Sequence, residues 1–151
     1  LINHLFNWAF AGRIGALVGR IGERRALTFE YIGLIGVFTA YAFVDDAYWA
    51  AGLYVLDHLF FSLAIAIKTY FQKIADPADM ASTAGVAFTI NHIAAVVIPA
   101  AFGLVWLVSP AAVFLMGTGM AFISLVLARN IPRVPCEGNE VLVGKVVVAS
   151  V

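Results

Sequence analysis

Four apolar stretches, each long enough to cross a bilayer, constrain this chain more than any other feature. They cover residues 26–44, 47–67, 83–107 and 111–128, and only short polar segments separate them. A helix that crosses the ~30 Å hydrocarbon core of a membrane needs about 20 mostly apolar residues. Lipid offers no hydrogen-bond partners to an open sheet edge, so the spans must be α-helices. We therefore predict an all-α, polytopic transmembrane helical bundle over residues 1–130.

The composition excludes an ordinary soluble domain. Of the 151 residues, 63% are hydrophobic and 12% are charged, and the mean hydropathy is +0.97. Soluble domains are usually about 45–50% apolar and about 25% charged. The single cysteine, Cys136, leaves no possibility of an internal disulfide. We expect the lipid bilayer to be the main partner of the chain, and we expect no nucleic acid.

The two ends of the sequence differ from the four spans. Residues 1–11 (LINHLFNWAFA) are apolar but too short to cross, so we expect them to be the end of a helix whose beginning is missing. Position 1 is also Leu rather than Met, which favours a fragment. Residues 131–151 form a predicted C-terminal tail. Its last part, VLVGKVVVASV, fits a strand, a disordered end or foreign sequence equally well.

The positive charges predict the orientation of the bundle. With four alternating crossings, all nine Lys and Arg residues fall on one side, in residues 12–25, 68–82 and 129–151. The two opposite turns carry only Asp45 and Asp46. Short loops rich in Lys and Arg remain in the cytoplasm. We therefore predict a multi-pass protein of the plasma or inner membrane, with its basic loops and C-terminus cytoplasmic.

The basic segment 12–25 also shows a resemblance to a known family. Its glycines interrupt any steady helical face, so we predict a loop. The sequence resembles the signature loop of the major facilitator superfamily, roughly G-x-L-x-D-R-x-G-R-R/K-x-x-L. The matching and neighbouring basic positions are Gly15, Leu17, Arg20, Gly22, Arg24, Arg25 and Leu27. Two positions depart from it, since Gly19 replaces the Asp and Glu23 replaces a basic residue.

The resemblance implies a fold and a function. In that family the loop joins helices two and three, and a more degenerate copy joins helices eight and nine. The chain would then hold the end of helix eight and helices nine to twelve, and its partner would be the missing N-terminal half. The family consists of secondary transporters, symporters or antiporters, that bind a small solute between two halves and expose it alternately to each side. The solute itself remains unidentified.

Polar residues inside the apolar stretches are the candidate site. Asp57 lies ten residues after Ala47, or ~15 Å into the membrane at ~1.5 Å per residue. A carboxylate there costs at least ~2.5 kcal/mol and is functional by default, so Asp57 and His58 are the candidates for proton coupling. Further candidates at similar depth are Asn3, His4, Asn91 and His92. For His4 and His92 we favour the structural alternative, a hydrogen bond to a neighbouring helix worth about 0.6 kcal/mol.

Three further features have both a functional and a structural interpretation. Glu30 lies one turn from the basic side, so we expect it to reach the membrane surface or to pair with Arg24 or Arg25. Pro99 removes a backbone donor inside the span 83–107, and it is either a gating kink or a tolerated one. Small residues around Gly33 and Gly117 offer patches for close approach of helices.

No catalytic motif accompanies these residues. The glycine-rich segment lacks the Gly-Lys-Ser/Thr ending of a phosphate-binding loop, and the three histidines lack the spacing of a helical metal site. We therefore predict a transporter rather than an enzyme, without cofactor or metal. The alternative is a non-transporting polytopic membrane protein, a receptor-like or assembly subunit. Access of aqueous reagents to Asp57 would distinguish the two.

Overall fold

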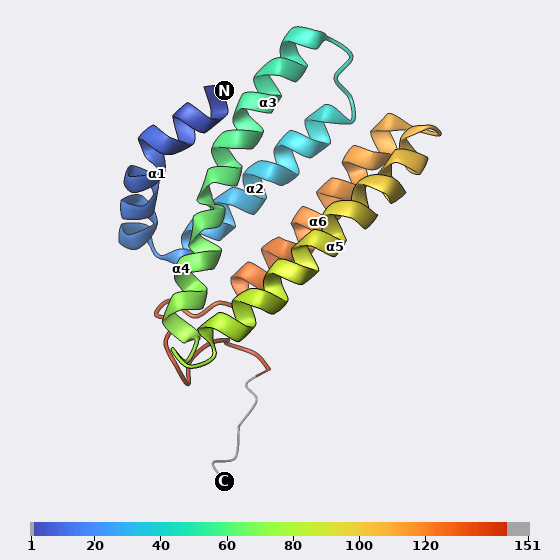
Figure 1. The fold of residues 1–151 in the computed structure, drawn as a ribbon. Helices are drawn as coiled ribbons and strands as arrows, with labels where there is room; N and C mark the ends of the chain where they lie inside the picture. Colours follow the sequence, from blue (N-terminus) through green and yellow to red (C-terminus); the bar gives the residue numbers. More distant parts are fainter. Residues whose placement is uncertain (1, 145–151) are drawn as a thin grey trace.

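The computed structural model describes residues 2–144, with side chains from residue 12 onward, and it consists of helices (Figure 1). The helices are α1 (Ile2–Ile21), α2 (Glu23–Tyr41), α3 (Ala47–Phe61), α4 (Ile65–Ile74), α5 (Met80–Trp106) and α6 (Pro110–Arg129). A short 3₁₀ segment, η1 (Ser62–Ala64), joins α3 to α4. No strand occurs between residues 2 and 144, and the all-α part of the prediction is confirmed.

Three helical stretches are long and apolar enough to cross a membrane. They are Ala47–Ile74, which combines α3, η1 and α4, then Met80–Trp106 and Pro110–Arg129. They correspond to three of the four predicted spans and are consistent with an integral membrane protein. The fourth predicted span corresponds to α2, which carries Glu23, Arg24 and Arg25 in its first turn and Glu30 further along. These charges make α2 more polar than the three spanning stretches. That α2 crosses the membrane stays a prediction.

Large apolar side chains cover the outside of these helices. Helix α5 has no buried residue, and its Phe88 and Val96 side chains are 64% and 73% exposed. Trp49 on α3 is likewise 71% exposed. Continuous apolar surface of this kind is unstable in water and marks contact with lipid or with another protein. The structure thus supports the membrane environment that the composition predicts.

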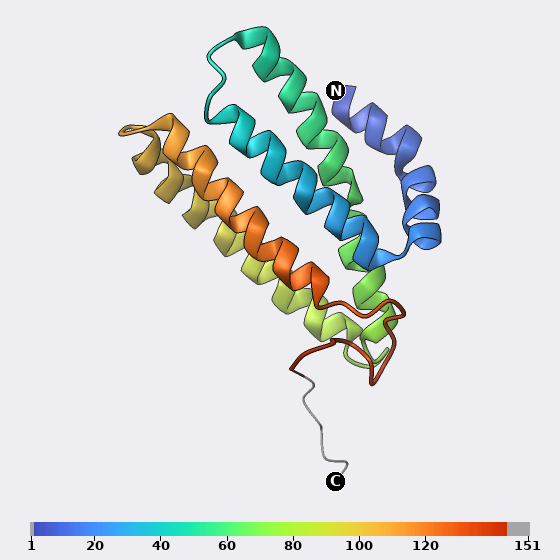
Figure 2. The same ribbon diagram turned by 180° about the vertical axis from the view of Figure 1, so that it is seen from behind.

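Four of the helices form a row in the order α3, α2, α6, α5 (Figures 1 and 2). The closest packing is between α2 and α6, where the hydroxyl oxygens of Thr39 and Thr118 are 3.3 Å apart. Near the same end of that interface the rings of Tyr41 and Phe114 stack with centroids 4.8 Å apart. Helix α1 lies outside the row, beside α2 and α4. Helices α3 and α5 are therefore at opposite ends of the row.

Helix starts show how local sequence sets the element boundaries. The Asp46 carboxylate accepts hydrogen bonds from two backbone N–H groups at the start of α3, those of Tyr48 and Trp49. Ser109 caps α6 in the same way, and Pro110 occupies the first turn, as its fixed φ favours. Helix α5 begins at Met80, and Asp79 holds the capping position without a side-chain hydrogen bond.

The structure differs from the predicted loop at residues 12–25. Helix α1 continues to Ile21, α2 begins at Glu23, and only Gly22 lies between them. Gly22 has φ 85°, a left-handed conformation that an L side chain rarely adopts, so this one glycine makes the turn. Each of the other glycines costs a helix up to ~1 kcal/mol, yet α1 is held by burial of residues such as Val18. Packing thus outweighs local helix preference here.

The hydrophobic core lies at one end of the bundle. Its buried members come from α1, α2, α4, α6 and the tail, and they are Val18, Ala26, Leu27, Ala66, Ala128 and Ile131. The first part of the tail is held against this core, since the Tyr70 hydroxyl donates to the Glu140 carbonyl oxygen over 2.6 Å. The Leu142 N–H also donates to the Asn130 carbonyl oxygen over 2.8 Å. The tail's last part, residues 141–151, is described only as far as residue 144 and has no strand there, and residues 145–151 lie outside the described residues.

The basic segments meet at this core end. The α1–α2 junction, the α4–α5 loop and the start of the tail lie together, whereas the α2–α3 and α5–α6 turns lie at the other end (Figure 1). Which membrane face each end occupies can be measured. We expect single cysteines at Asp45 and Gln72, with Cys136 replaced by Ser, to react with an impermeant maleimide from opposite sides of intact cells. Asp45 is preferred to Asp46 because Asp46 caps α3. Labelling from one side only would contradict the predicted topology.

Candidate functional site

Asp57 and His58 lie side by side on α3, inside the span Ala47–Ile74. The His58 Nδ1 is 3.7 Å from the nearer Asp57 carboxylate oxygen, and the two side chains are 36% and 27% exposed. The same Nδ1 lies 3.0 Å from the Tyr54 carbonyl oxygen, and the imidazole packs on the Tyr54 ring at 4.2 Å. An Nδ1–H that donates to this carbonyl leaves Nε2 of His58 as a hydrogen-bond acceptor.

His92 on α5 repeats the local arrangement of His58. Its Nδ1 lies 2.9 Å from the Phe88 carbonyl oxygen one turn earlier, and its ring packs on the Phe88 ring at 3.9 Å. The Asn91 and His92 residues are both exposed. This contact gives Nδ1 of His92 a hydrogen-bond partner within its own helix. We expected His92 to bond a neighbouring helix, whereas the structure shows a bond to Phe88 of the same helix.

The structure does not join the three polar pairs into one site. Helices α3 and α5, which carry the pairs Asp57–His58 and Asn91–His92, are separated by α2 and α6 (Figure 2). Between residues 12 and 144 no hydrogen bond or ion pair links these two pairs. Asn3 and His4 lie on α1, but their side chains are outside the described ones. Any shared site would need groups beyond these described helices.

Glu30 is the ionisable residue that sequence reasoning misplaced. It is 2% exposed, and its Oε2 atom is buried without a hydrogen-bond partner, so it neither reaches the surface nor pairs with Arg24 or Arg25. The reason is helical spacing, because Glu30 follows Leu27 by three residues and precedes Leu34 by four. Both leucines are buried on the face of α2 that packs inward. The i, i+3, i+4, i+7 pattern would have revealed this position.

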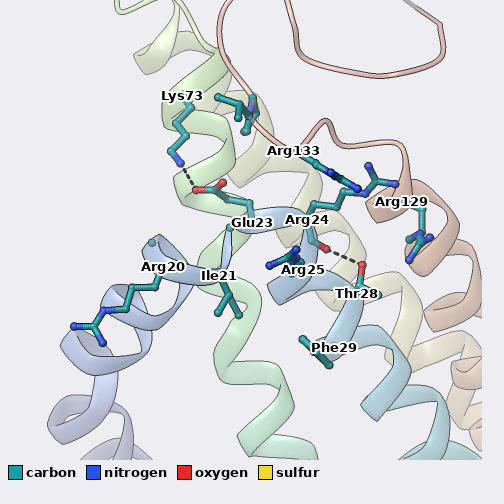
Figure 3. A pocket seen from close by; sticks show the side chains of 14 residues that line it. Arg20, Ile21, Glu23, Arg24, Arg25, Thr28, Phe29, Lys73, Arg129 and Arg133 are labelled. Atoms are coloured by element: carbon teal, nitrogen blue, oxygen red, sulfur yellow. Dashed lines mark hydrogen bonds and ion pairs between the residues drawn. The ribbon is translucent and has the colours of Figure 1, made fainter.

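A wide cleft, here called the basic cleft, opens beside the core at the Gly22 turn (Figure 3). Its volume is about 660 Å³. Its lining includes six basic side chains, Arg20, Arg24, Arg25, Lys73, Arg129 and Arg133, and one acidic side chain, Glu23. The Lys73 ammonium lies 2.6 Å from the Glu23 carboxylate, which is 2% exposed. Segments far apart in the sequence thus bring their positive charges to one place.

Some of the signature-like residues line this cleft, and others lie where helices pack together. Arg20, Gly22, Arg24 and Arg25 line the basic cleft. Gly15 does not, and a Cβ there would lie 4.0 Å from the Ile65 side chain, in ordinary contact with the α3–α4 region. Sequence reasoning grouped these residues as one loop and did not anticipate Arg129 and Arg133 beside them. Nothing in the local sequence places the tail next to the α1–α2 turn.

Pro99 lies within an uninterrupted α5 and is exposed. Its role in gating stays a prediction. In the described part of the chain, no three His, Cys, Asp or Glu side chains are grouped so that they could hold a metal ion.

No protein-family model, curated protein or solved structure matches the chain. The resemblance to the major facilitator signature therefore rests on the residues of the α1–α2 turn alone.

Proposed function

We propose that this chain is part of a secondary active transporter of the major facilitator type, which moves a small solute across a membrane by alternating access. In this proposal the chain belongs to the C-terminal half, and another half completes the solute pathway. Three apolar helices of spanning length, apolar outer surfaces and basic segments gathered at one end support it. The signature-like turn around Gly22 supports it further.

The observation that carries the proposal is the presence of ionisable side chains within helices that are otherwise apolar. Asp57 and His58 lie inside the span Ala47–Ile74 and are partly exposed on α3. Glu30 lies on the packed face of α2, and its Oε2 atom has no hydrogen-bond partner. Acids in membrane helices are costly, and they usually serve a substrate, an ion or a proton. A purely structural bundle would gain stability from apolar residues at these positions.

The geometry suggests how a proton could be exchanged. The Asp57 carboxylate lies 3.7 Å from Nδ1 of the His58 imidazole, and both side chains are partly exposed on α3. A proton bound to Asp57 neutralises its charge and lowers the cost of the group in an apolar environment. A protein that exposes this pair alternately to the two sides would bind the proton on one side and release it on the other. Symport and antiport both fit this cycle.

The test compares Asp57→Asn with wild type in the complete transporter, reconstituted in liposomes with an imposed pH gradient. A panel of labelled solutes first identifies one that the wild type accumulates. We expect Asp57→Asn to abolish accumulation and to retain solute exchange, because the amide holds no exchangeable charge. Asp45→Asn, in the exposed turn, is the matched control and should accumulate solute normally. Accumulation by Asp57→Asn equal to wild type would disprove the proton role.

A further inference from the structure

The basic cleft gathers positive charge without a matching negative charge. Five arginines line it, Arg20, Arg24, Arg25, Arg129 and Arg133, and within the described residues none of them forms an ion pair. The acid in its lining, Glu23, is buried and bound by Lys73. That carboxylate is therefore unavailable to the arginines. Like charges held together repel one another, and an anion in the cleft would relieve the repulsion.

The start of α2 adds to the positive potential of the cleft. Gly22 occupies the capping position and offers no side chain to the free backbone N–H groups of the first turn. Gly22, Glu23, Arg24 and Arg25 all line the cleft, so this helix start forms part of its wall. Helix N-termini carry partial positive charge and favour phosphate and other anions. The backbone and the side chains therefore favour the same kind of ligand.

The size, composition and place of the cleft indicate which anion it accepts. In the view of Figure 3, the side chains of Arg24 and Arg133 extend toward the same part of the cleft, whereas Arg20 extends away from it. Guanidinium groups bind phosphate through two parallel N–H groups, which makes arginine the preferred residue for this ligand. The cleft also lies at the ends of apolar helices, at the level where lipid headgroups would be.

We propose that the basic cleft binds a phosphate group, presented either by an anionic phospholipid headgroup or by a soluble phosphate. Arg24 and Arg133 hold the phosphate oxygens, and the first turn of α2 supports them. Binding joins the α1–α2 turn to the tail through a shared anion. This site is separate from the Asp57–His58 pair and does not depend on the proposed transport.

The first test measures binding by calorimetry to the chain in nanodiscs of phosphatidylcholine, a lipid without net charge. Inorganic phosphate and soluble dihexanoyl phosphatidic acid are the two titrants. Binding of both with similar affinity supports the proposal and shows that a soluble phosphate suffices. Binding of phosphatidic acid alone supports it with a lipid headgroup as the source. If neither titrant binds, the proposal is overturned.

Variants then locate the binding site. Loss of a charge-assisted hydrogen bond usually weakens binding about tenfold or more, so Arg24→Gln with Arg133→Gln should weaken it about 100-fold. Lys68→Gln removes one exposed positive charge from α4 outside the cleft lining, and it should leave the affinity within about twofold of wild type. Equal affinity of the double variant and wild type would overturn the assignment to this cleft.

A measurement on wild type alone does not depend on correct folding of the double variant. Phenylglyoxal modifies accessible arginines, and mass spectrometry of the digested chain gives the extent at each position. The bound titrant should slow modification of Arg24 and Arg133 by at least about tenfold. Arg13, which lies outside the cleft lining, should react at an unchanged rate. Equal rates at Arg24 with and without the titrant would contradict the proposal.

Discussion

Gly33→Ala is expected to destabilise the chain, whereas Gly36→Ala is not. A Cβ at Gly33 would overlap the Phe60 ring at its Cγ, Cδ1 and Cε1 atoms. We expect this overlap to displace the Phe60 ring or to push α3 away from α2. At Gly36, three residues later on the same helix, a Cβ would meet no atom within 4 Å. Both variants gain the same helical preference of Ala over Gly, so their difference isolates the overlap.

The expected cost of Gly33→Ala is about 1–3 kcal/mol, the usual range for adding volume to a packed site. Unfolding in detergent micelles, driven by sodium dodecyl sulfate and followed by circular dichroism, measures it. Gly36→Ala should equal wild type or exceed it slightly. If the two variants unfold at the same detergent fraction, α2 and α3 do not pack as closely as the Gly33–Phe60 contact implies.

The elements of this fold follow from sequence to different degrees. Long apolar stretches predict α5 and α6 well, because chain length and lipid leave little alternative to a helix. The boundary at α1 could not be predicted, because the glycines of residues 12–22 favour a loop locally. Burial of Val18 in a core to which α2, α4, α6 and the tail also contribute decides against the loop. That packing involves residues more than 100 positions away in the sequence, such as Ala128.

The candidate site also has features that sequence predicts and features that depend on long-range packing. The presence of Asp57 and His58 in an apolar helix follows from spacing alone, and the structure places them next to each other. The burial of Glu30 could also be predicted from sequence, because its spacing from Leu27 and Leu34 puts it on the packed face. That Arg24 and Arg133 line the same cleft could not be predicted from sequence, since it depends on how the tail returns to the α1–α2 turn. Long-range packing decides which charges share a cleft.

Glu30→Met is expected to make the chain more stable, and Glu23→Met is expected to make it less stable. Both acids are 2% exposed on the same face of α2, seven residues apart, and they differ in their partners. Glu23 is bound by Lys73, whereas Oε2 of Glu30 has no hydrogen-bond partner. An unpaired buried polar group costs about 1–3 kcal/mol, and Met of similar size removes that cost. Glu30→Met should therefore gain up to about that amount.

The opposite sign at Glu23 comes from the loss of an ion pair. Glu23→Met removes the partner of Lys73 and a favourable negative charge in the first turn of α2. Because Lys73 is 48% exposed and stays solvated, the expected loss is only about 1–2 kcal/mol. The same micelle unfolding measures both variants. Stabilisation by Glu30→Met together with loss of gradient-driven solute accumulation in the complete transporter would mean that Glu30 is retained for proton transfer at the expense of stability. A destabilised Glu30→Met would instead show that this carboxyl has a partner within the folded bundle.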